Sequence, residues 1–390
     1  MPARAPEEIF REGKNLRGTR SQFPLLARAA TGQTPRVLNI FTEQLARAEA
    51  LTESEVTAAV EQLIDERVAP QCKADFLTAL AVKGETTAEI AAFARALRDK
   101  SIRPPINPAA SQFGEILDVC GTGGDRLNTF NISTTVAIVA AAAGVTVAKH
   151  GNRAITSQAG SADVLEALGI PVELTPEQAA QSLREHGFAF FFAPKYHPAF
   201  KHLGPARKLC AERGQRTIFN FLGPLLNPAR PTAQLIGVPR PQLCEPMARV
   251  LQSLGIRRGM VVSGEVPGAP PAPPAYLDEL STLGPNTVAE FYHDRGFSVT
   301  TVSPEDFPLR PAKLSDLAGA DRHANATIIR RILRGEERGP KRDAVLLNAA
   351  AALFVAARTR SMAEGWDLAA TVIDDGRAAR KLAALAVNAA

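Results

Sequence analysis

The chain has 390 residues, of which 45% are hydrophobic and 22% charged, a composition typical of a globular enzyme and not of a disordered or fibrous protein. The net charge of +5 permits binding of a polyanion without requiring it, and equally suits a protein that handles phosphorylated metabolites. None of the four cysteines forms a Cys-x-x-Cys pair, which argues against a zinc or dithiol site and favours a cytoplasmic location.

The first hundred residues are predicted to be helical. An apolar segment from Val37 to Ala48 indicates a helix within an N-terminal extension, residues 1–50. Residues 51–107 are expected to form a small all-helical domain, which helices around 195–225 could also join. Within it, Thr52 and then Thr86 or Thr87 are expected to cap helices, and Gly84 to end one.

From residue 108 to residue 390 the pattern changes to short apolar runs that alternate with helices. Such alternation predicts a large α/β domain with a mainly parallel sheet flanked by helices. The longest apolar stretch, Val136 to Val147, is too short to cross a bilayer, so no membrane association is expected. The expected strands are Ile116–Cys120, Val145–Ala148, Phe188–Phe192, Leu235–Val238, Met260–Ser263 and Ser298–Val302, with helices at about 134–143, 161–168, 176–186, 241–253 and 343–358.

A glycine-rich loop follows the first of these strands, at Gly121-Thr122-Gly123-Gly124-Asp125. Glycine lets a ligand approach backbone N–H groups, and the helix that follows directs its positive end toward the loop. A tight strand-to-helix turn would explain the glycines alone, but the polar residues that follow favour an anion site, most naturally for phosphate. Ser133 or Thr134 is expected at the start of the helix, where its hydroxyl could cap the helix or bind a metal or phosphate.

Further polar residues follow the second expected strand, at Lys149-His150-Gly151-Asn152-Arg153. Parallel neighbouring strands end at the same sheet edge, so this stretch and the glycine-rich loop could converge on one ligand. Lys149 would supply a point charge for phosphate. A single histidine is more often structural than catalytic, and its position here makes the two roles equally plausible for His150. Ser161, at the start of the next expected helix, could contact a second phosphate oxygen.

Two more sets of charged residues are ambiguous by themselves. Adjacent carboxylates at Asp278 and Glu279 suit Mg²⁺, although a solvated acidic pair is the more common explanation. Arg207 and Arg216 bound a highly charged segment, and arginine is the residue of choice for a carboxylate ligand, but spacing alone selects neither. A segment rich in proline, from Val266 to Ala275, is expected to be a surface loop.

Several of these stretches, in this order, resemble the anthranilate phosphoribosyltransferase family, which shares the nucleoside phosphorylase-type fold. The resemblance runs from about residue 51 to the C-terminus and combines many motifs, which makes it far more specific than any one. The matching stretches are Gly-Thr-Gly-Gly-Asp at 121–125, Asn-Ile-Ser-Thr at 131–134, Lys-His-Gly-Asn-Arg at 149–153, Gly-Ser-Ala-Asp-Val-Leu-Glu-Ala-Leu-Gly at 160–169, His-Pro-Ala at 197–199, Arg-Thr-Ile-Phe-Asn-Phe-Leu-Gly-Pro-Leu-Leu-Asn-Pro at 216–228, Leu-Asp-Glu-Leu-Ser at 277–281 and Gly-Glu-Glu-Arg-Gly-Pro-Lys-Arg-Asp at 335–343.

The resemblance implies a magnesium-dependent homodimer that transfers a phosphoribosyl group from phosphoribosyl pyrophosphate to anthranilate in tryptophan biosynthesis. It implies no catalytic acid, base or nucleophile, and relies on positioning and electrostatic stabilisation. Phosphoribosyl pyrophosphate is expected at Gly121, Thr122, Gly123, Gly124, Asp125, Thr129, Asn131, Ser133, Thr134, Lys149 and Ser161. Anthranilate is expected at Gly121, His150, Asn152, His197 and Arg207, and Mg²⁺ at Ser133, Asp278 and Glu279.

The sequence departs from the family pattern at four places. Gln158-Ala159 stands where the family carries Lys-Ser, the 207–216 segment is longer than usual, the proline-rich segment 266–275 replaces a shorter approach to the acidic pair, and residues 1–50 are mostly additional. These departures leave two other activities open, transfer to another aromatic acceptor and nucleoside phosphorolysis. A relative that binds nucleic acid without catalysis is a third alternative, against which the intact phosphate and metal motifs argue.

Overall fold

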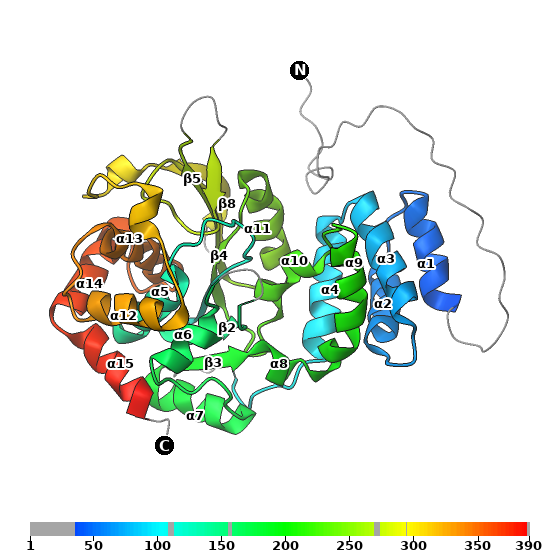
Figure 1. Cartoon of the computed structure of the whole chain (residues 1–390), viewed down its shortest axis with the longest axis horizontal. Helices are drawn as coiled ribbons and strands as arrows, with labels where there is room; N and C mark the ends of the chain where they lie inside the picture. The colour runs from blue at the N-terminus through cyan, green and yellow to red at the C-terminus, as the bar shows by residue number, and fades with distance from the viewer. Residues whose placement is uncertain (1–35, 108–112, 155–157, 269–273, 294, 388–390) are drawn as a thin grey trace. The chain divides into compact units, whose positions relative to one another are not determined.

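The computed structural model describes residues 36–107, 113–154, 158–268, 274–293 and 295–387 (Figure 1). The chain forms two compact units, and each is built from two separate stretches of sequence. The first unit contains the residues up to Ala96 together with Ala199–Phe219, and the second contains Leu97–Pro198 and Asn220–Ala390. The limits expected for the N-terminal extension and the helical domain remain predictions.

The first unit is helical. Thr52 caps its second helix, because the Thr52 hydroxyl accepts from the Glu55 N–H while the Glu55 carboxylate accepts from the Thr52 N–H. Gly84 ends the third helix and Thr86 caps the fourth, as predicted. The helices are α1 (Arg36–Ala46), α2 (Glu53–Ile64), α3 (Pro70–Lys83), α4 (Thr87–Asp99, which extends into the second unit) and α9 (Gly204–Glu212).

The second unit contains a mainly parallel eight-stranded sheet, which confirms the predicted fold class. Its strands lie in the order β3-β2-β1-β4-β5-β7-β8; β1 to β5 are parallel, β7 and β8 are antiparallel, and β6 pairs with β5. The strands are β1 (Ile116–Gly121), β2 (Thr146–Gly151), β3 (Phe188–Phe192), β4 (Ala233–Gly237), β5 (Arg258–Val266), β6 (Ala275–Leu277), β7 (Asn286–Tyr292) and β8 (Arg295–Val302).

Helices cover both faces of this sheet (Figure 1). On one face α5 and α13 pack against each other and on the central strands, and nearly every side chain of α13 is buried. On the other face α7 packs on β3 and α11 on β5 and β7. The helices are α5 (Ile132–Ala142), α6 (Ser161–Ala167), α7 (Pro176–His186), α8 (Ala193–Tyr196), α10 (Phe219–Leu222), α11 (Cys244–Ser253), α12 (Arg322–Leu333), α13 (Pro340–Val355), α14 (Met362–Asp374) and α15 (Arg377–Val387).

Five short 3₁₀ helices complete the described secondary structure. They are η3 (Pro198–Leu203), η4 (Gly223–Leu226), η5 (Pro241–Leu243), η6 (Pro304–Asp306) and η7 (Leu314–Leu317).

The structure corrects the sequence-based assignment at several points. Helix α5 begins at Ile132 with Asn131 as its N-cap, so neither Ser133 nor Thr134 caps it; both lie inside its first turn. The ends of the proline-rich segment are not loop, since Val266 pairs with Ala275 across β5 and β6; residues 269–273 lie outside the described residues. Strands β6 and β7 and helices α12, α14 and α15 were not predicted.

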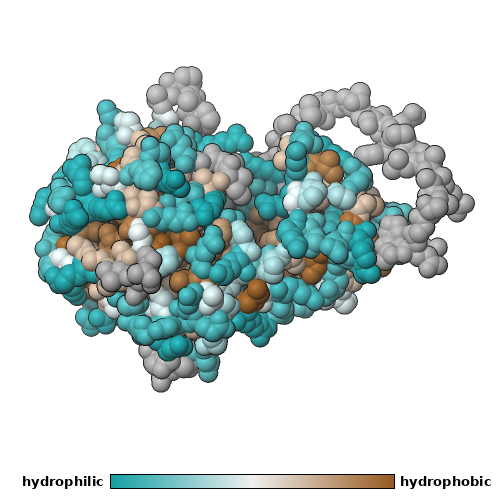
Figure 2. All heavy atoms as spheres, turned by 60° about the horizontal axis from the view of Figure 1, so that its bottom comes forward, coloured by the Kyte–Doolittle hydropathy of each residue, from teal (hydrophilic) through white to brown (hydrophobic). Residues whose placement is uncertain are grey.

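The surface on the face shown in Figure 2 is largely hydrophilic, with scattered apolar patches. Within the described residues, no helix combines the length and apolar character needed to cross a membrane.

Candidate functional site

The glycine-rich loop leaves the carboxyl end of β1 as predicted. Gly123 and Gly124 adopt left-handed conformations, with φ of 77° and 90°, which few other residues accept. The Thr122 N–H donates to Gly237 O at 2.9 Å, which ties the loop to the end of the neighbouring strand β4. The loop is therefore anchored at one end, and its glycines carry no side chains of their own, which lets other groups approach the loop backbone closely.

The acidic pair Asp278 and Glu279 lies against this loop. Asp278 Oδ2 accepts from the Gly123 N–H at 2.6 Å, and Glu279 Oε1 accepts from the Ser133 N–H at 3.2 Å. A Cβ placed on Gly121 would lie 2.1 Å from Asp278 Oδ2, and one on Gly237 would lie 1.6 Å from Asp278 O. The pair can approach the loop this closely only because β1 and β4 both end in glycine.

Lys149 brings a positive charge to the same place. It is buried, and its Nζ donates to Val119 O at 2.6 Å and to Ser133 Oγ at 3.5 Å. Its charge lowers the pKa of Glu279, although burial dominates and raises that pKa to about 7. The predicted convergence of the 121–125 loop, Ser133, Lys149 and the acidic pair is present within the second unit.

The acidic pair suits an oxygen-loving cation. Burial, followed by the charges of Asp125 and Glu279, raises the pKa of Asp278 well above its ordinary value, so a cation would relieve the repulsion among these carboxyls. The described residues contain no group of three or more His, Cys, Asp or Glu side chains arranged to hold a metal ion. Two carboxylates and the Ser133 hydroxyl would leave coordination positions for water and phosphate oxygens, as Mg²⁺ usually requires.

The residues after the loop are held by segments that lie far from them in the sequence. Thr129 pairs as an isolated bridge with Ala318. The side chain of Asn131 donates to Ala159 O at 3.1 Å, and its Oδ1 accepts from Asn325 Nδ2 at 3.0 Å. Asn325, on α12, is buried and was missed by the sequence analysis. In the sequence, Asn325 is a single amide near the start of an amphipathic helix. Spacing alone does not distinguish such an amide from a surface residue.

The second polar stretch lies beside the start of α6. The Ser161 hydroxyl donates to Asn152 O at 3.3 Å, and a Cβ on Gly151 would lie 2.2 Å from Ser161 Oγ. Asp163 Oδ2 accepts from the N–H groups of both Ala154 and Gly160, each at 2.9 Å. Asn152 and Ser161, predicted to bind different substrates, are thus direct neighbours.

His150 and His197 face each other, with ring centroids 5.5 Å apart in an edge-to-face arrangement. His150 Nδ1 lies 3.2 Å from Gly223 O, and a carbonyl can only accept, so Nδ1 carries the proton. His150 Nε2 is buried, has no hydrogen-bond partner among the described residues, and keeps its lone pair. Burial lowers the pKa of His150 to about 3 and that of His197 to about 4, so both rings are neutral at neutral pH.

A buried carboxyl accepts a hydrogen bond from the backbone of His150. Asp118, fully buried on β1, accepts from the His150 N–H at 3.2 Å and from Asn227 Nδ2 at 2.9 Å. Burial raises the pKa of Asp118 to about 6. Asp118 lies within a run predicted only as an apolar strand, and a carboxylate inside such a run was the available signal for a functional residue.

Arg207 lies in the first unit, on α9. It is exposed, and its guanidinium carbon lies 5.4 Å from the centre of the Phe219 ring. At the departure from the family pattern formed by Gln158-Ala159, Gln158 is exposed, whereas Ala159 is buried and its carbonyl accepts from the Asn131 side chain.

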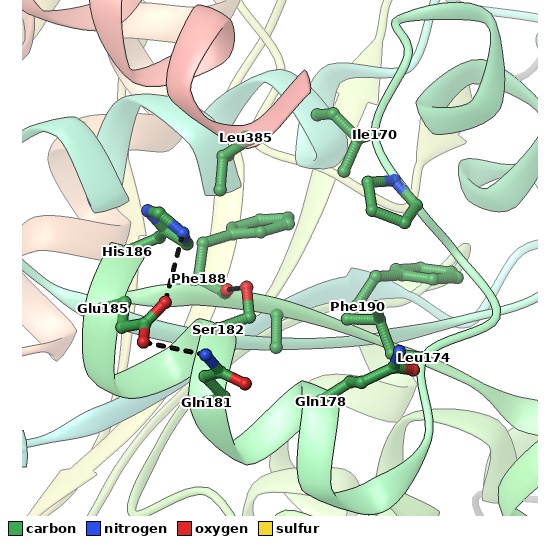
Figure 3. Close-up of a pocket in the computed structure, with 12 residues that line it drawn as sticks. Ile170, Leu174, Gln178, Gln181, Ser182, Glu185, His186, Phe188, Phe190 and Leu385 are labelled. Atoms are coloured by element: carbon green, nitrogen blue, oxygen red, sulfur yellow. Dashed lines mark hydrogen bonds and ion pairs between the residues drawn. The ribbon is translucent and has the colours of Figure 1, made fainter. Parts of the chain in front are cut away.

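A pocket of about 200 Å³ lies elsewhere in the second unit, between α7, β3 and Leu385 of α15 (Figure 3). Its polar side chains already have local partners: Ser182 Oγ donates to Phe188 O at 2.6 Å, and Gln181 donates to Glu185 at 2.9 Å. The first bond satisfies a carbonyl on the edge strand β3, so these groups stabilise the fold.

Two family models match the chain. The α/β domain of a glycosyl transferase family matches residues 114–379, and the helical bundle domain of a glycosyl transferase family matches residues 40–101.

Individual proteins and solved structures are similar to this chain over most of its length. Anthranilate phosphoribosyltransferase of Chloroflexus aggregans is 45% identical over 332 residues, covering 85% of this chain and 92% of that protein. The enzyme of the same name from Symbiobacterium thermophilum is 47% identical, covering 87% and 94%. The crystal structure of the Thermus thermophilus enzyme has a TM-score of 0.78 at 42% identity, covering 90% and 99%. The Saccharomyces cerevisiae enzyme in complex with PRPP and Mg has a TM-score of 0.78 at 28% identity, covering 90% and 97%.

Proposed function

Because the chain belongs to the anthranilate phosphoribosyltransferase family, we propose that it transfers the 5-phosphoribosyl group of phosphoribosyl pyrophosphate to the amine of anthranilate. The products are N-(5-phosphoribosyl)anthranilate and pyrophosphate, in tryptophan biosynthesis. The observation that carries this proposal is the convergence of a glycine-rich loop, Lys149 and two carboxylates at the carboxyl ends of β1, β2 and β4.

Phosphoribosyl pyrophosphate would lie along the loop. The Lys149 ammonium lies 3.5 Å from the Ser133 hydroxyl, and both groups suit phosphate oxygens. The backbone of the glycine-rich loop would supply further N–H groups to the same substrate. The residues assigned to this substrate are Gly121, Thr122, Gly123, Gly124, Asp125, Thr129, Asn131, Ser133, Thr134, Lys149 and Ser161.

Ser133, Asp278 and Glu279 would hold Mg²⁺, which is present with PRPP in the yeast relative. Bound there, the cation would neutralise charge on the departing pyrophosphate. The chain itself contributes the fixed ammonium of Lys149 and the loop N–H groups, which favour the same charge without having to reorganise.

Anthranilate is assigned to Gly121, His150, Asn152 and His197 of the second unit and to Arg207 of the first. The Arg207 assignment rests on the resemblance alone. As the bond from the amine nitrogen to the ribose C1 forms, the bond from C1 to pyrophosphate oxygen breaks, and the nitrogen then releases a proton. An aryl amine is neutral at pH 7, so no strong base is needed. His150, with its pKa lowered to about 3, could accept a hydrogen bond from the anthranilate amine but would not hold the proton that the amine releases.

The decisive measurement is the loss of anthranilate fluorescence on addition of enzyme, phosphoribosyl pyrophosphate and Mg²⁺. Wild-type protein is expected to turn over, and the double substitution Asp278→Asn with Glu279→Gln to lose Mg²⁺-dependent activity. Glu305→Gln, an exposed acid on η6, is the matched control and should behave as wild type. No turnover by wild type at high enzyme concentration would refute the proposal.

The alternatives predict different results. Another aromatic acceptor would be revealed by pyrophosphate release in an acceptor screen, and phosphorolysis by phosphate-dependent release of a base. Nucleic-acid binding would fall steeply with salt. A homodimer and a cytoplasmic location stay predictions, of which the first can be tested by light scattering.

A further inference from the structure

A single amide in the middle of α13 holds the backbone next to the acidic pair. The Leu280 N–H donates to Asn348 Oδ1 at 2.9 Å, and Asn348 Nδ2 donates back to Leu280 O at 2.9 Å. The second hydrogen on Nδ2 is directed to Ala344 O, also at 2.9 Å. One side chain thus binds both backbone groups of the residue that follows Glu279, as a neighbouring β-strand would.

The orientation of this amide is unambiguous. An N–H can only donate and a carbonyl can only accept, so the oxygen must face the Leu280 N–H and the nitrogen must face the two carbonyls. Asn348 is fully buried, and every hydrogen on its amide is used. Rotating or removing the amide would leave buried backbone groups without partners, at a cost that fixes its position.

Asparagine is an unfavourable choice at this place in a helix. Its neighbours on α13 are alanine, leucine and valine, which form helices better and suit the surrounding core. Among the described residues, the Asn348 side chain bonds outside α13 only to Leu280. These two bonds are what the asparagine provides that a leucine would not.

The backbone held in this way leads directly to the two carboxylates. Glu279 precedes Leu280, and Asp278 packs between the glycine ends of β1 and β4. On the other side of Leu280, Asn286 binds both backbone groups of Ser281, accepting from its N–H at 2.6 Å and donating to its carbonyl at 3.0 Å. Both backbone groups of two successive residues, Leu280 and Ser281, are therefore held immediately after the pair.

We propose that Asn348 is a positioning residue for the metal-binding carboxylates: by fixing Leu280 it sets where Asp278 and Glu279 meet the glycine-rich loop. This inference rests on the metal role proposed above for the acidic pair. Within the described part of the chain, the Asn348 side chain hydrogen-bonds to Leu280 and Ala344 and not to either carboxylate, so its effect passes through the backbone of Leu280.

The test compares Asn348→Ala with Leu353→Ala, a matched control that truncates a fully buried side chain on the same helix away from the pair. Both variants should melt at a lower temperature. Only Asn348→Ala should weaken Mn²⁺ binding in the presence of phosphoribosyl pyrophosphate, measured by electron paramagnetic resonance, by about tenfold or more. Its KM for Mg²⁺ should rise in parallel, while its KM for anthranilate stays near that of wild type.

Asn348→Ser, a smaller change, is measured alongside in case the alanine variant does not fold, and the same weakening of Mn²⁺ binding is expected. Asp278→Asn separates this inference from the proposed function. If it abolishes Mn²⁺ binding while the Asn348 variants bind as Leu353→Ala does, the positioning role is refuted alone. If Asp278→Asn leaves Mn²⁺ binding intact, the metal assignment and the positioning role both fall.

Discussion

At the scale of single residues, the geometry of the candidate site depends on glycines at positions where a Cβ atom would collide with a neighbour. Gly237 is the sharpest case, because the obstruction there would be Asp278 backbone and not a flexible side-chain end. A methyl group at Gly237 must push the acidic pair away from the loop.

We therefore expect Gly237→Ala to lower kcat/KM by about a hundredfold, the effect of a displacement of about 1 Å at a reacting centre. Gly296→Ala is the control, since a Cβ there would meet nothing within 4 Å and its φ is ordinary. Steady-state kinetics with anthranilate and phosphoribosyl pyrophosphate compare the two. Equal activity of both variants would mean that the contact between Gly237 and Asp278 is not needed.

The neutral state of His150 gives a second expectation. Burial, with the neighbouring His197, lowers its pKa to about 3, so its Nε2 lone pair is available at every pH at which the protein is assayed. KM for anthranilate should show no titration assignable to His150 between about pH 5 and pH 8, since the charged form is populated only below that range.

The check is the proton NMR titration of the histidine rings, with His150→Gln to assign the signal. A ring that titrates near pH 6.5 and disappears in His150→Gln would contradict the buried, neutral imidazole. The same shift affects the free energy of unfolding. As the pH falls below 6.5, the unfolded chain binds a proton at His150 before the folded chain does. The stability that depends on neutral His150 is therefore greatest above pH 6.5 and declines as the pH falls toward 3.

At the scale of elements, α6 and the end of β2 are joined by one carboxylate. Asp163 accepts from both Ala154 and Gly160, and Arg153 bridges to Glu166 through two bonds of 2.7 Å. Partial burial opposes the charge of Asp163, but the backbone hydrogen bonds and Arg153 outweigh it and lower its pKa.

Asp163→Ala should raise KM for phosphoribosyl pyrophosphate more than KM for anthranilate, because Ser161 shares this junction. It should lower the free energy of unfolding by about 1 kcal/mol, because the two N–H groups left unpaired are only partly buried. Urea denaturation and kinetics measure the two effects, with the exposed Glu177→Gln as control. An unchanged KM for phosphoribosyl pyrophosphate would show that the junction serves stability only.

Local patterns predicted the parallel part of the sheet well. Strands β1 to β5 have dense apolar runs, and their carboxyl ends carry the polar stretches that converge in the structure. Strand β7 was missed although it pairs with the next strand, β8. It also pairs along its full length with β5, which precedes it by about 20 residues, and its own sequence does not indicate this second partner. Helix α14 contains Gly365, which reads as a helix breaker; a Cβ there would lie 2.6 Å from Ala350 O of α13, so the glycine permits close helix packing.

The site was predictable where motifs are contiguous and hidden where support is remote. Asn131, Ser133 and Lys149 lie in recognisable stretches. Asn325 and Asn348 are single amides in helices, and their partners lie 194 and 68 residues away in the sequence. Only the fold brings such pairs together, which is why spacing could not reveal them.

At the scale of the whole molecule, the helical unit is completed by a segment from far along the chain. Helix α9 packs on α3, and buried Lys73 donates to both Asp65 O at 2.8 Å and His202 O at 3.1 Å. Without residues 199–219, Lys73 would lose one of these acceptors and the apolar face of α3 would lose its cover.

A fragment of residues 36–100 should therefore unfold with low cooperativity, and a peptide of residues 199–219 added in trans should raise its melting temperature. Circular dichroism during heating measures this, with a scrambled peptide as control. A fragment that melts cooperatively, with no change on adding the peptide, would show that the N-terminal helices fold independently.

The support of the acidic pair by Asn348 also orders events during protein synthesis. The ribosome produces the Gly123 loop first, the carboxylate it contacts 155 residues later, and Asn348 a further 70 residues on. A nascent chain that has not yet released α13 from the exit tunnel has every group proposed to bind substrate and metal, yet lacks the amide that clamps the metal loop. If Asn348 positions the acidic pair as proposed, competence to bind the cation would appear only after α13 has emerged, and a nonsense mutation before α13 would leave the carboxylates without this support.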